Sequence, residues 1–256
     1  MKTYFQNIYS IFCFFYREIA TFYNHLIFKE KSYNTKINPP IYFNFTHKYN
    51  VKRNLKKLNC KYLKFEFQEI EIFNQKGINY LIKELFTENL REFISSKTGF
   101  NYSIDFFLCY KNFPIPKSKS NQSIYANKLH FDKPYSKNML KIIIPINVLN
   151  ENYGPLAVKI ESQHNKNLNL SPNDNFKAFY CSNSENTLIH AFFPSRVYHK
   201  AFIPEVNKYC YQIMLQLNPS KEWGINTKIE GRQYKKEPKF VEINYLFDKR
   251  ISLNKI

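Results

Sequence analysis

From residue 100 onward the sequence is a succession of short β-strand candidates, and this pattern limits the chain to a few architectures. The segments between the candidates, such as 112–122, 150–154 and 171–175, are rich in Pro, Asn, Ser and Gly, which favour turns. Eight short strands at these intervals are typical of an all-β barrel or a double-sheet jelly roll. The eight candidates are residues 102–110, 123–131, 139–149, 155–160, 176–181, 187–193, 196–202 and 209–217.

The preceding part of the chain predicts two regular elements. Residues 62–73 alternate charged and apolar side chains with a period of two, which indicates a strand. Residues 77–99 carry apolar side chains at spacings of three and four and end in Gly99, which predicts a supporting helix. With 256 residues, we expect one domain at 61–256 and an N-terminal extension of unknown role at 1–60.

The charge of the chain leaves two classes of partner open. The sequence contains 38 Lys and Arg against 20 Asp and Glu, for a formal net charge of +18. This charge fits a nucleic-acid-binding protein or capture of an anionic small molecule. Because no compact basic run alternates with aromatic residues, we interpret the charge as a general composition bias that can still aid capture of an acidic substrate, and nucleic-acid binding is kept as an alternative. A hydrophobic fraction of 44% excludes intrinsic disorder for the chain as a whole.

Cysteine usage and the N-terminal segment bear on the compartment. Five cysteines without a C-x-x-C pair predict neither a disulfide framework nor a zinc ribbon, so we expect a reducing, cytoplasmic environment. Residues 8–16 are apolar, but Arg17 and Glu18 follow directly and no small-residue cleavage pattern appears. The segment is also too short to cross a bilayer, so we expect no membrane span.

One pair of polar residues points to a metal site. His130 and Asp132 are two residues apart, so on a strand both side chains lie on the same face. Imidazole and carboxylate ligands suit Fe(II), and a second histidine would complete a facial triad with open coordination positions. His199, 67 residues after Asp132, fits this role, and His190 is its rival. A solvated strand end remains the alternative reading of the His-Asp pair.

The residues around this pair resemble those of the Fe(II)/2-oxoglutarate-dependent dioxygenases, in particular the phytanoyl-CoA dioxygenase-like branch. In residues 130–164 the H-x-D pair is followed by an apolar strand, a turn with an amide and Gly, and a short strand that ends in a Ser/His loop. The resemblance implies a double-stranded β-helix (a cupin-like jelly roll), mainly β with flanking helices. It also implies Fe(II) held by His130, Asp132 and His199, with 2-oxoglutarate and O₂ as cosubstrates. The turn and loop residues that match are Asn152, Gly154, Pro155, Ser162 and His164.

The resemblance further implies a basic residue that binds the distal carboxylate of 2-oxoglutarate. Lys208, nine residues beyond His199, has the spacing of prolyl-hydroxylase-like members, whereas phytanoyl-type members usually carry an arginine slightly later. Lys141, a charge within an apolar strand, and Arg196 are weaker candidates for the same role. Tyr125 is a candidate substrate residue at the rim of the pocket.

These observations lead to one functional expectation and two alternatives. We expect an Fe(II)/2-oxoglutarate-dependent oxygenase that hydroxylates a small-molecule substrate whose identity the sequence does not give and for which an anion is one option. Halogenation is disfavoured because related halogenases replace the carboxylate ligand, whereas this chain keeps Asp132. The alternatives are a jelly-roll protein that binds a metal or ligand without turnover, and a basic nucleic-acid-binding protein.

Overall fold

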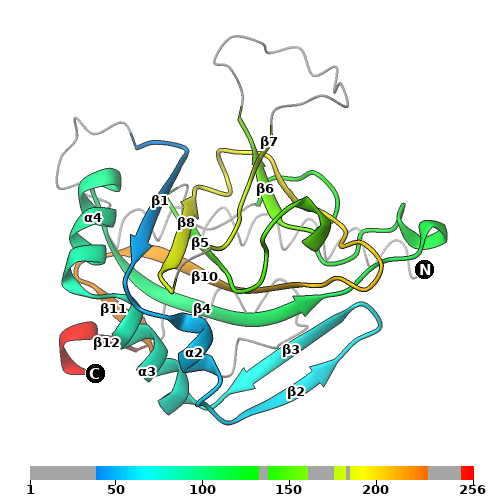
Figure 1. Ribbon diagram of the computed structural model, residues 1–256. Helices are drawn as coiled ribbons and strands as arrows, with labels where there is room; N and C mark the ends of the chain where they lie inside the picture. The colour runs from blue at the N-terminus through cyan, green and yellow to red at the C-terminus, as the bar shows by residue number, and fades with distance from the viewer. Residues whose placement is uncertain (1–38, 133–137, 161–175, 183–184, 230–248) are drawn as a thin grey trace, which may run out of the picture.

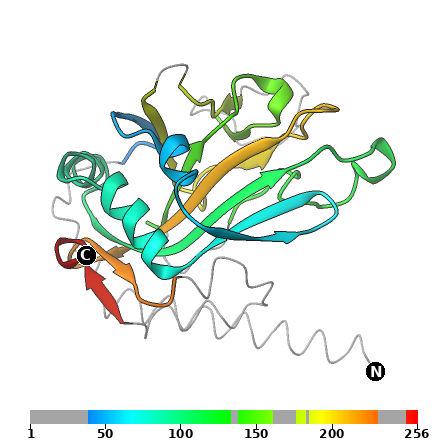
Figure 2. The same cartoon turned by 60° about the horizontal axis from the view of Figure 1, so that its bottom comes forward.

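A large, mainly antiparallel β-sheet forms the centre of the protein (Figure 1). The computed structural model describes residues 39–132, 138–160, 176–182, 185–229 and 249–256. The longest strands of the sheet pair along 11 positions, with a bulge between Gln216 and Leu217. A hairpin formed by residues 60–73 pairs with one end of the strand at 101–112 and so extends the sheet, as Figure 2 shows. The order is β1 (Tyr42–His47), β8 (Thr187–Phe192), β5 (Leu140–Pro145), β10 (Cys210–Ser220), β4 (Asn101–Asn112), β11 (Gly224–Asn226) and β12 (Arg250–Ser252), and the hairpin is β2 (Cys60–Lys64) with β3 (Gln68–Phe73).

A small antiparallel sheet packs over part of the large one. Its order is β7 (Phe176–Ala178), β6 (Leu156–Lys159) and β9 (His199–Ala201). On the other side of β9, His130 forms an isolated antiparallel bridge with His199. From β4 to β10 the chain therefore passes repeatedly between the two sheets. In this stretch β4, β5, β8 and β10 lie in the large sheet, and the His130 bridge, β6, β7 and β9 lie on the side of the small sheet. This alternation is the strand order of a double-stranded β-helix jelly roll, as predicted.

Among the described residues, three α-helices cover the outer face of the large sheet, and each face of the sheet has its own apolar core. The outer core joins the helices to β4, β5, β8 and β10, and the inner core lies between the two sheets. In β5 every residue is buried, with Ile142 and Ile144 in the outer core and Ile143 in the inner core. Successive side chains of a strand point to opposite faces, so the continuous apolar run of β5 fills both cores. The helices are α2 (Val51–Leu55), α3 (Gln75–Leu85) and α4 (Glu88–Thr98), and short 3₁₀ turns occur at η1 (Lys117–Lys119), η2 (Glu151–Tyr153) and η4 (Leu253–Lys255).

Three predicted elements differ from the structure. Residues 62–73 are two strands of a hairpin, because the chain turns where Phe65 N donates to the carbonyl of Gln68 at 2.7 Å. The helix expected at 77–99 is two helices that break at Phe86 and Thr87, although Gly99 ends the second in the left-handed region as predicted. Residues 123–131 form no strand, because Tyr125 and Ala126 have φ of 36° and 63°.

The N-terminal region is described only from residue 39. Within the extension expected at 1–60, β1 pairs with β8 along six positions, and Val51 and Leu55 of α2 are buried in the outer core. The described part of this segment thus packs on the large sheet, while the boundary at residue 60 stays a prediction. The apolar segment 8–16 and His164 lie outside the described residues. Within the described ranges, no helix has the length and apolar character needed to cross a membrane.

Candidate metal centre

His130, Asp132 and His199 come together where the bridge segment meets the small sheet. The backbone N–H of His130 donates to the carbonyl of His199 at 3.1 Å, and the N–H of His199 donates to the carbonyl of His130 at 3.0 Å. Asp132 is held by its own backbone N–H, which donates to the carbonyl of Pro194 at 3.0 Å. These bonds place two imidazole rings with centroids 4.3 Å apart beside one carboxylate.

The donor atoms of the three residues converge on one point. One ligand atom from each residue lies within 4.8 Å of the other two. Asp132 Oδ1 lies 3.5 Å from His130 Nε2 and 3.6 Å from His199 Nε2, and these distances exceed those of a normal hydrogen bond. Three donors around a shared gap are what a metal ion with two imidazole ligands and one carboxylate ligand needs.

The hydrogen bonds of both imidazoles fix which nitrogen is free. His130 Nδ1 lies 2.7 Å from the carbonyl of Lys128, and His199 Nδ1 lies 3.2 Å from the carbonyl of Val197. A carbonyl can only accept, so each Nδ1 carries the proton and each neutral ring presents the lone pair of Nε2. His199 Nε2 is buried and has no hydrogen-bond partner among the residues that the structure describes. Such an orphaned acceptor, on a ring oriented by a backbone carbonyl, fits a metal ligand.

The electrostatics of the group favour the ligand protonation states of Asp132 and His199 and oppose proton loss from His130. Burial opposes ionisation of Asp132, but the Lys141 ammonium and the two imidazoles outweigh it and hold the pKa of the carboxyl well below its usual range. Burial lowers the pKa of His199, whereas contact with Asp132 raises the pKa of His130. At neutral pH Asp132 is therefore an anion and His199 is neutral, as metal binding needs.

Lys141 is the basic candidate that contacts the group. It is 6% exposed, lies on the inner face of β5 and forms an ion pair between its Nζ and Asp132 Oδ2. Its Nζ also lies 6.0 Å from the centroid of the Phe192 ring, and the same ring lies 5.0 Å from the ring of His199. Phe192 was not a predicted site residue. It reaches the site because β8 pairs with β5 so that Phe192 is opposite Lys141, and no local sequence pattern gives that register.

The other predicted site residues lie elsewhere. Lys208 is in the exposed turn before β10, with its Nζ 5.2 Å from the centroid of the Tyr153 ring. Arg196 stacks on Phe193 at 4.5 Å and donates from Nη2 to Asn138. Tyr125 donates from its hydroxyl to the carbonyl of Phe113 at 2.8 Å, and burial raises its pKa.

His190, the rival third ligand, is committed to the inner core. Its Nε2 lies 2.9 Å from the carbonyl of Tyr180, and its Nδ1 lies 2.8 Å from the hydroxyl of Tyr42. Since the carbonyl only accepts, Nε2 donates to it and Nδ1 accepts from the hydroxyl. The ring also stacks on Phe179, with centroids 4.6 Å apart and an interplanar angle of 8°. Both nitrogens are used, so His190 offers no free donor atom to a metal.

Comparison with known proteins gives the following similarities. No protein-family model matches the sequence, and no curated protein matches it. Among solved structures, the chain is similar to the non-heme alpha-ketoglutarate-dependent epimerase SnoN from nogalamycin biosynthesis, with 8% identity, a TM-score of 0.45, and coverage of 70% of this chain and 78% of that one. It is also similar to HygX from Streptomyces hygroscopicus with nickel and 2-oxoglutarate bound, with 7% identity, a TM-score of 0.45, and coverage of 72% and 84%. A prolyl-4-hydroxylase from Pseudomonas putida gives 9% identity, a TM-score of 0.41, and coverage of 70% and 92%.

The class of the protein follows from its own strand order and site. Those features define a double-stranded β-helix protein with a cluster of two histidines and an aspartate at one end of the jelly roll.

Proposed function

We propose that this protein is an Fe(II)- and 2-oxoglutarate-dependent oxygenase that hydroxylates a small molecule. The observation that carries the proposal is the orientation of the two histidines: each donates from Nδ1 to a backbone carbonyl and directs Nε2 toward Asp132. His130, Asp132 and His199 would hold Fe(II) by one face and leave the other positions open. When bound, Fe(II) couples the oxidative decarboxylation of 2-oxoglutarate by O₂, to succinate and CO₂, to the insertion of one oxygen atom into a substrate C–H bond.

The chain's own residues position the reactants and exclude water. Phe192 forms an apolar wall against both His199 and the Lys141 side chain. Lys141 is a buried cation in contact with the ligand group, and we propose that it leaves Asp132 and binds a carboxylate of 2-oxoglutarate when the charge of Asp132 is neutralised. Lys208 is the anchor predicted from sequence spacing, but it lines a cavity that none of the three candidate ligands lines, and the experiment described next compares the two lysines.

The first experiment measures the cofactor pair directly. Fe(II) and 2-oxoglutarate are added to the protein without oxygen, and the weak visible charge-transfer band of the ternary complex is recorded. We expect the band in the natural protein and its loss in His199→Gln, because a buried imidazole ligand is removed. His190→Gln is the matched control, and it should keep the band because both nitrogens of His190 are engaged in the core. O₂-dependent release of succinate then serves to screen substrates.

Titration of this band with 2-oxoglutarate identifies the anchor. A charge-assisted hydrogen bond contributes roughly 1.5–3 kcal/mol, so Lys141→Met should raise the Kd for 2-oxoglutarate by roughly 10- to 100-fold. Lys208→Met is tested beside it, and the larger loss of affinity identifies the anchor. Lys200→Met is the control on β9, the strand that carries His199, because the Lys200 ammonium lies against the rings of Phe176 and Phe202 at 4.6 and 4.5 Å. A native band together with an unchanged Kd in Lys141→Met would contradict the assignment of Lys141.

One observation favours a second candidate function. Lys141 already pairs with Asp132, so the carboxylate has a cation partner within the protein. A jelly roll with such an internal ion pair can bind a small ligand without a metal or turnover. In that case Fe(II) would neither bind nor produce a band, and 2-oxoglutarate would not be consumed.

A further inference from the structure

A cavity lies at the other end of β5 from the candidate metal ligands. Its volume is about 680 Å³, which is within the range of small-molecule sites. Pro145 at the end of β5 lines the cavity, whereas Lys141 on the same strand contacts Asp132. Four residues of extended strand separate the two positions by about 13 Å. None of the three candidate ligands lines the cavity, so it is a separate site.

Hydrogen bonds within the protein hold the cavity walls in place. Asn147 Oδ1 accepts from the backbone N–H of Tyr211 at 2.7 Å, and Asn147 Nδ2 donates to the carbonyl of Tyr209 at 2.9 Å. Thr187 Oγ1 accepts from the N–H of Val51 at 3.1 Å and so ties the start of β8 to α2. A cavity whose walls are fixed in this way is formed before any ligand arrives, which lowers the ordering cost of binding.

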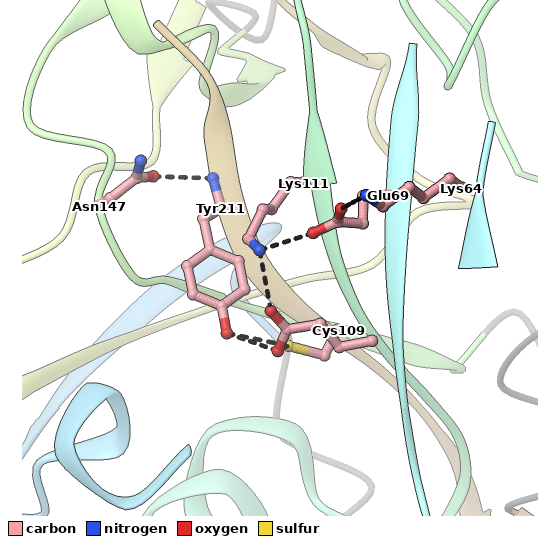
Figure 3. A network of polar contacts seen from close by, with 7 residues as sticks. Lys64, Glu69, Cys109, Lys111, Asn147 and Tyr211 are labelled. Carbon is pink, nitrogen blue, oxygen red and sulfur yellow. Dashed lines mark hydrogen bonds and ion pairs between the residues drawn. The ribbon is translucent and has the colours of Figure 1, made fainter. Parts of the chain in front are cut away.

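A polar network behind this wall supports Tyr211 (Figure 3). The Tyr211 hydroxyl donates to Glu71 Oε2 at 2.7 Å, and Lys111 Nζ lies 3.1 Å from Glu71 Oε1 and 2.7 Å from Glu69 Oε1. Glu71 is 5% exposed, so its charge is buried together with these partners. The backbone of Tyr211 that binds Asn147 is thus anchored through its own side chain (Figure 3).

The charges at the cavity favour an anionic ligand. Lys52 and Lys208 line it, and in the part of the chain that the structure describes neither forms an ion pair with a carboxylate. Glu185 is the one acidic residue among the described residues that line the cavity. The Cys181 thiol also lines it: burial raises the pKa of this thiol, and the nearby Lys52 ammonium opposes that rise. Two lysines outside any ion pair among the described residues, against one glutamate, give this preformed polar cavity a net positive charge that can bind carboxylate or phosphate groups.

We propose that this cavity binds a small organic anion with carboxylate or phosphate groups, and that Lys52 and Lys208 supply the opposing charge. The site is distinct from the candidate metal centre and does not depend on the proposed oxygenase activity. Its polar walls, with the Asn147 side chain fixed on one side and Thr187 on another, set the space for the uncharged part of the ligand.

Cys181 provides a reporter for this site within the full-length protein. Iodoacetamide, a neutral reagent, is allowed to react, and mass spectrometry follows the alkylation rate of each cysteine peptide separately. Citrate and inorganic pyrophosphate are the two probes, with potassium chloride at matched ionic strength as the reference. Cys60 on β2 is the internal control, because it is also partly exposed and does not line the cavity.

We expect one of the probes to slow alkylation of Cys181 and to leave Cys60 unchanged. Protection should reach roughly fivefold when the anion is present at about four times its Kd. The double variant Lys52→Met, Lys208→Met should lose this protection, and both lysines are exposed, so the fold should tolerate the changes. Lys200→Met, which removes the same charge on β9, should keep it. Protection is calculated within each variant, because removal of Lys52 also changes the basal reactivity of Cys181.

The outcomes are distinct. Protection by citrate alone assigns a carboxylate ligand, and protection by pyrophosphate alone assigns a phosphate ligand. Equal rates in chloride, citrate and pyrophosphate would overturn the proposal, and so would protection that persists in the double variant. Either result leaves the oxygenase proposal untouched, since that is tested by the charge-transfer band.

Discussion

The buried His190 should make the protein markedly less stable in mild acid. Burial lowers the pKa of His190 from its ordinary 6.5 to about 4, because a charged imidazole would be poorly solvated between Phe179 and Tyr42. The unfolded chain therefore takes up a proton at higher pH than the folded protein does. Stability contributed by neutral His190 is complete above pH 6.5 and is lost progressively as the pH falls toward the folded pKa.

The size of the effect follows from the two pKa values. Linkage gives a loss of about 2.4 kcal/mol in the free energy of unfolding from this one residue between pH 7 and about pH 4.5. The assay is urea unfolding of the natural protein and of His190→Phe at both pH values. Phenylalanine keeps a flat ring against Phe179 but does not titrate, and the other titrating groups are common to both proteins. His190→Gln serves as a second non-titrating variant in case the phenylalanine variant fails to fold.

The difference between the natural protein and the variant is the informative quantity. At pH 7 the variant should be less stable, because the Tyr42 hydroxyl and the Tyr180 carbonyl lose their partner. At about pH 4.5 the natural protein should have lost about 2.4 kcal/mol relative to the variant. An equal pH dependence in both proteins would refute the reasoning, because it would mean that His190 takes up its proton at the same pH in the folded and unfolded chains.

Three further predictions concern other parts of the molecule. Gly154→Ala should destabilise the protein by at least about 2 kcal/mol in urea unfolding, because φ is +68° and the new Cβ would lie 2.6 Å from the ring of Pro204. Gly77→Ala is the matched variant and should stabilise the protein by up to about 1 kcal/mol, because the new Cβ makes an ordinary 3.4 Å contact in α3. A Gly77→Ala variant that is less stable than Gly154→Ala would contradict this reasoning. Arg250→Met should lower the free energy of unfolding by about 3 kcal/mol, because Asp105 is 1% exposed and its carboxylate loses the guanidinium that lies 3.3 Å away. The midpoint of urea unfolding measures this loss, and an unchanged midpoint would refute the prediction. Ni(II), which binds without turnover, should raise the Tm of the natural protein and leave His199→Gln unchanged; equal shifts in both would place the metal elsewhere.

The strand pattern after residue 100 predicts most of the jelly roll, because alternating side chains and turn residues are local signals. Seven of the eight candidates contain a strand. The remaining candidate, 123–131, forms no strand because Tyr125 and Ala126 have positive φ and bend the chain. Neither residue is a glycine, so the sequence does not indicate the bend. The hairpin of β2 and β3 was missed for a similar reason: its turn, at residues 65–67, contains no Gly, Pro or Asn.

The candidate site shows the same division between local and long-range information. His130 and Asp132 are a local i, i+2 pair, and the structure places His199 beside them; their role as ligands stays a prediction. The contact of Lys141 with Asp132 depends on how a segment after β4 folds across β5. The position of Phe192 depends on the register between β5 and β8. Neither is encoded by the spacing of residues along the chain, so the sequence alone could only rank Lys141 below Lys208.

The isolated bridge between His130 and His199 has a dynamic consequence. Two backbone hydrogen bonds join the first histidine to β9, and this bridge lies outside the named strands. The same segment is also held by the N–H of Ala201, which donates to the carbonyl of Ala126 at 2.9 Å, and by the N–H of Asp132, which donates to the carbonyl of Pro194 at 3.0 Å. A local opening that breaks these four bonds would separate the two imidazoles without unfolding either sheet. An ion could enter the site when this bridge opens, and a bound ion would hold the bridge closed. Amide hydrogen exchange at these two residues would register that locking as slowed exchange, while exchange along β4 and β10 stays constant.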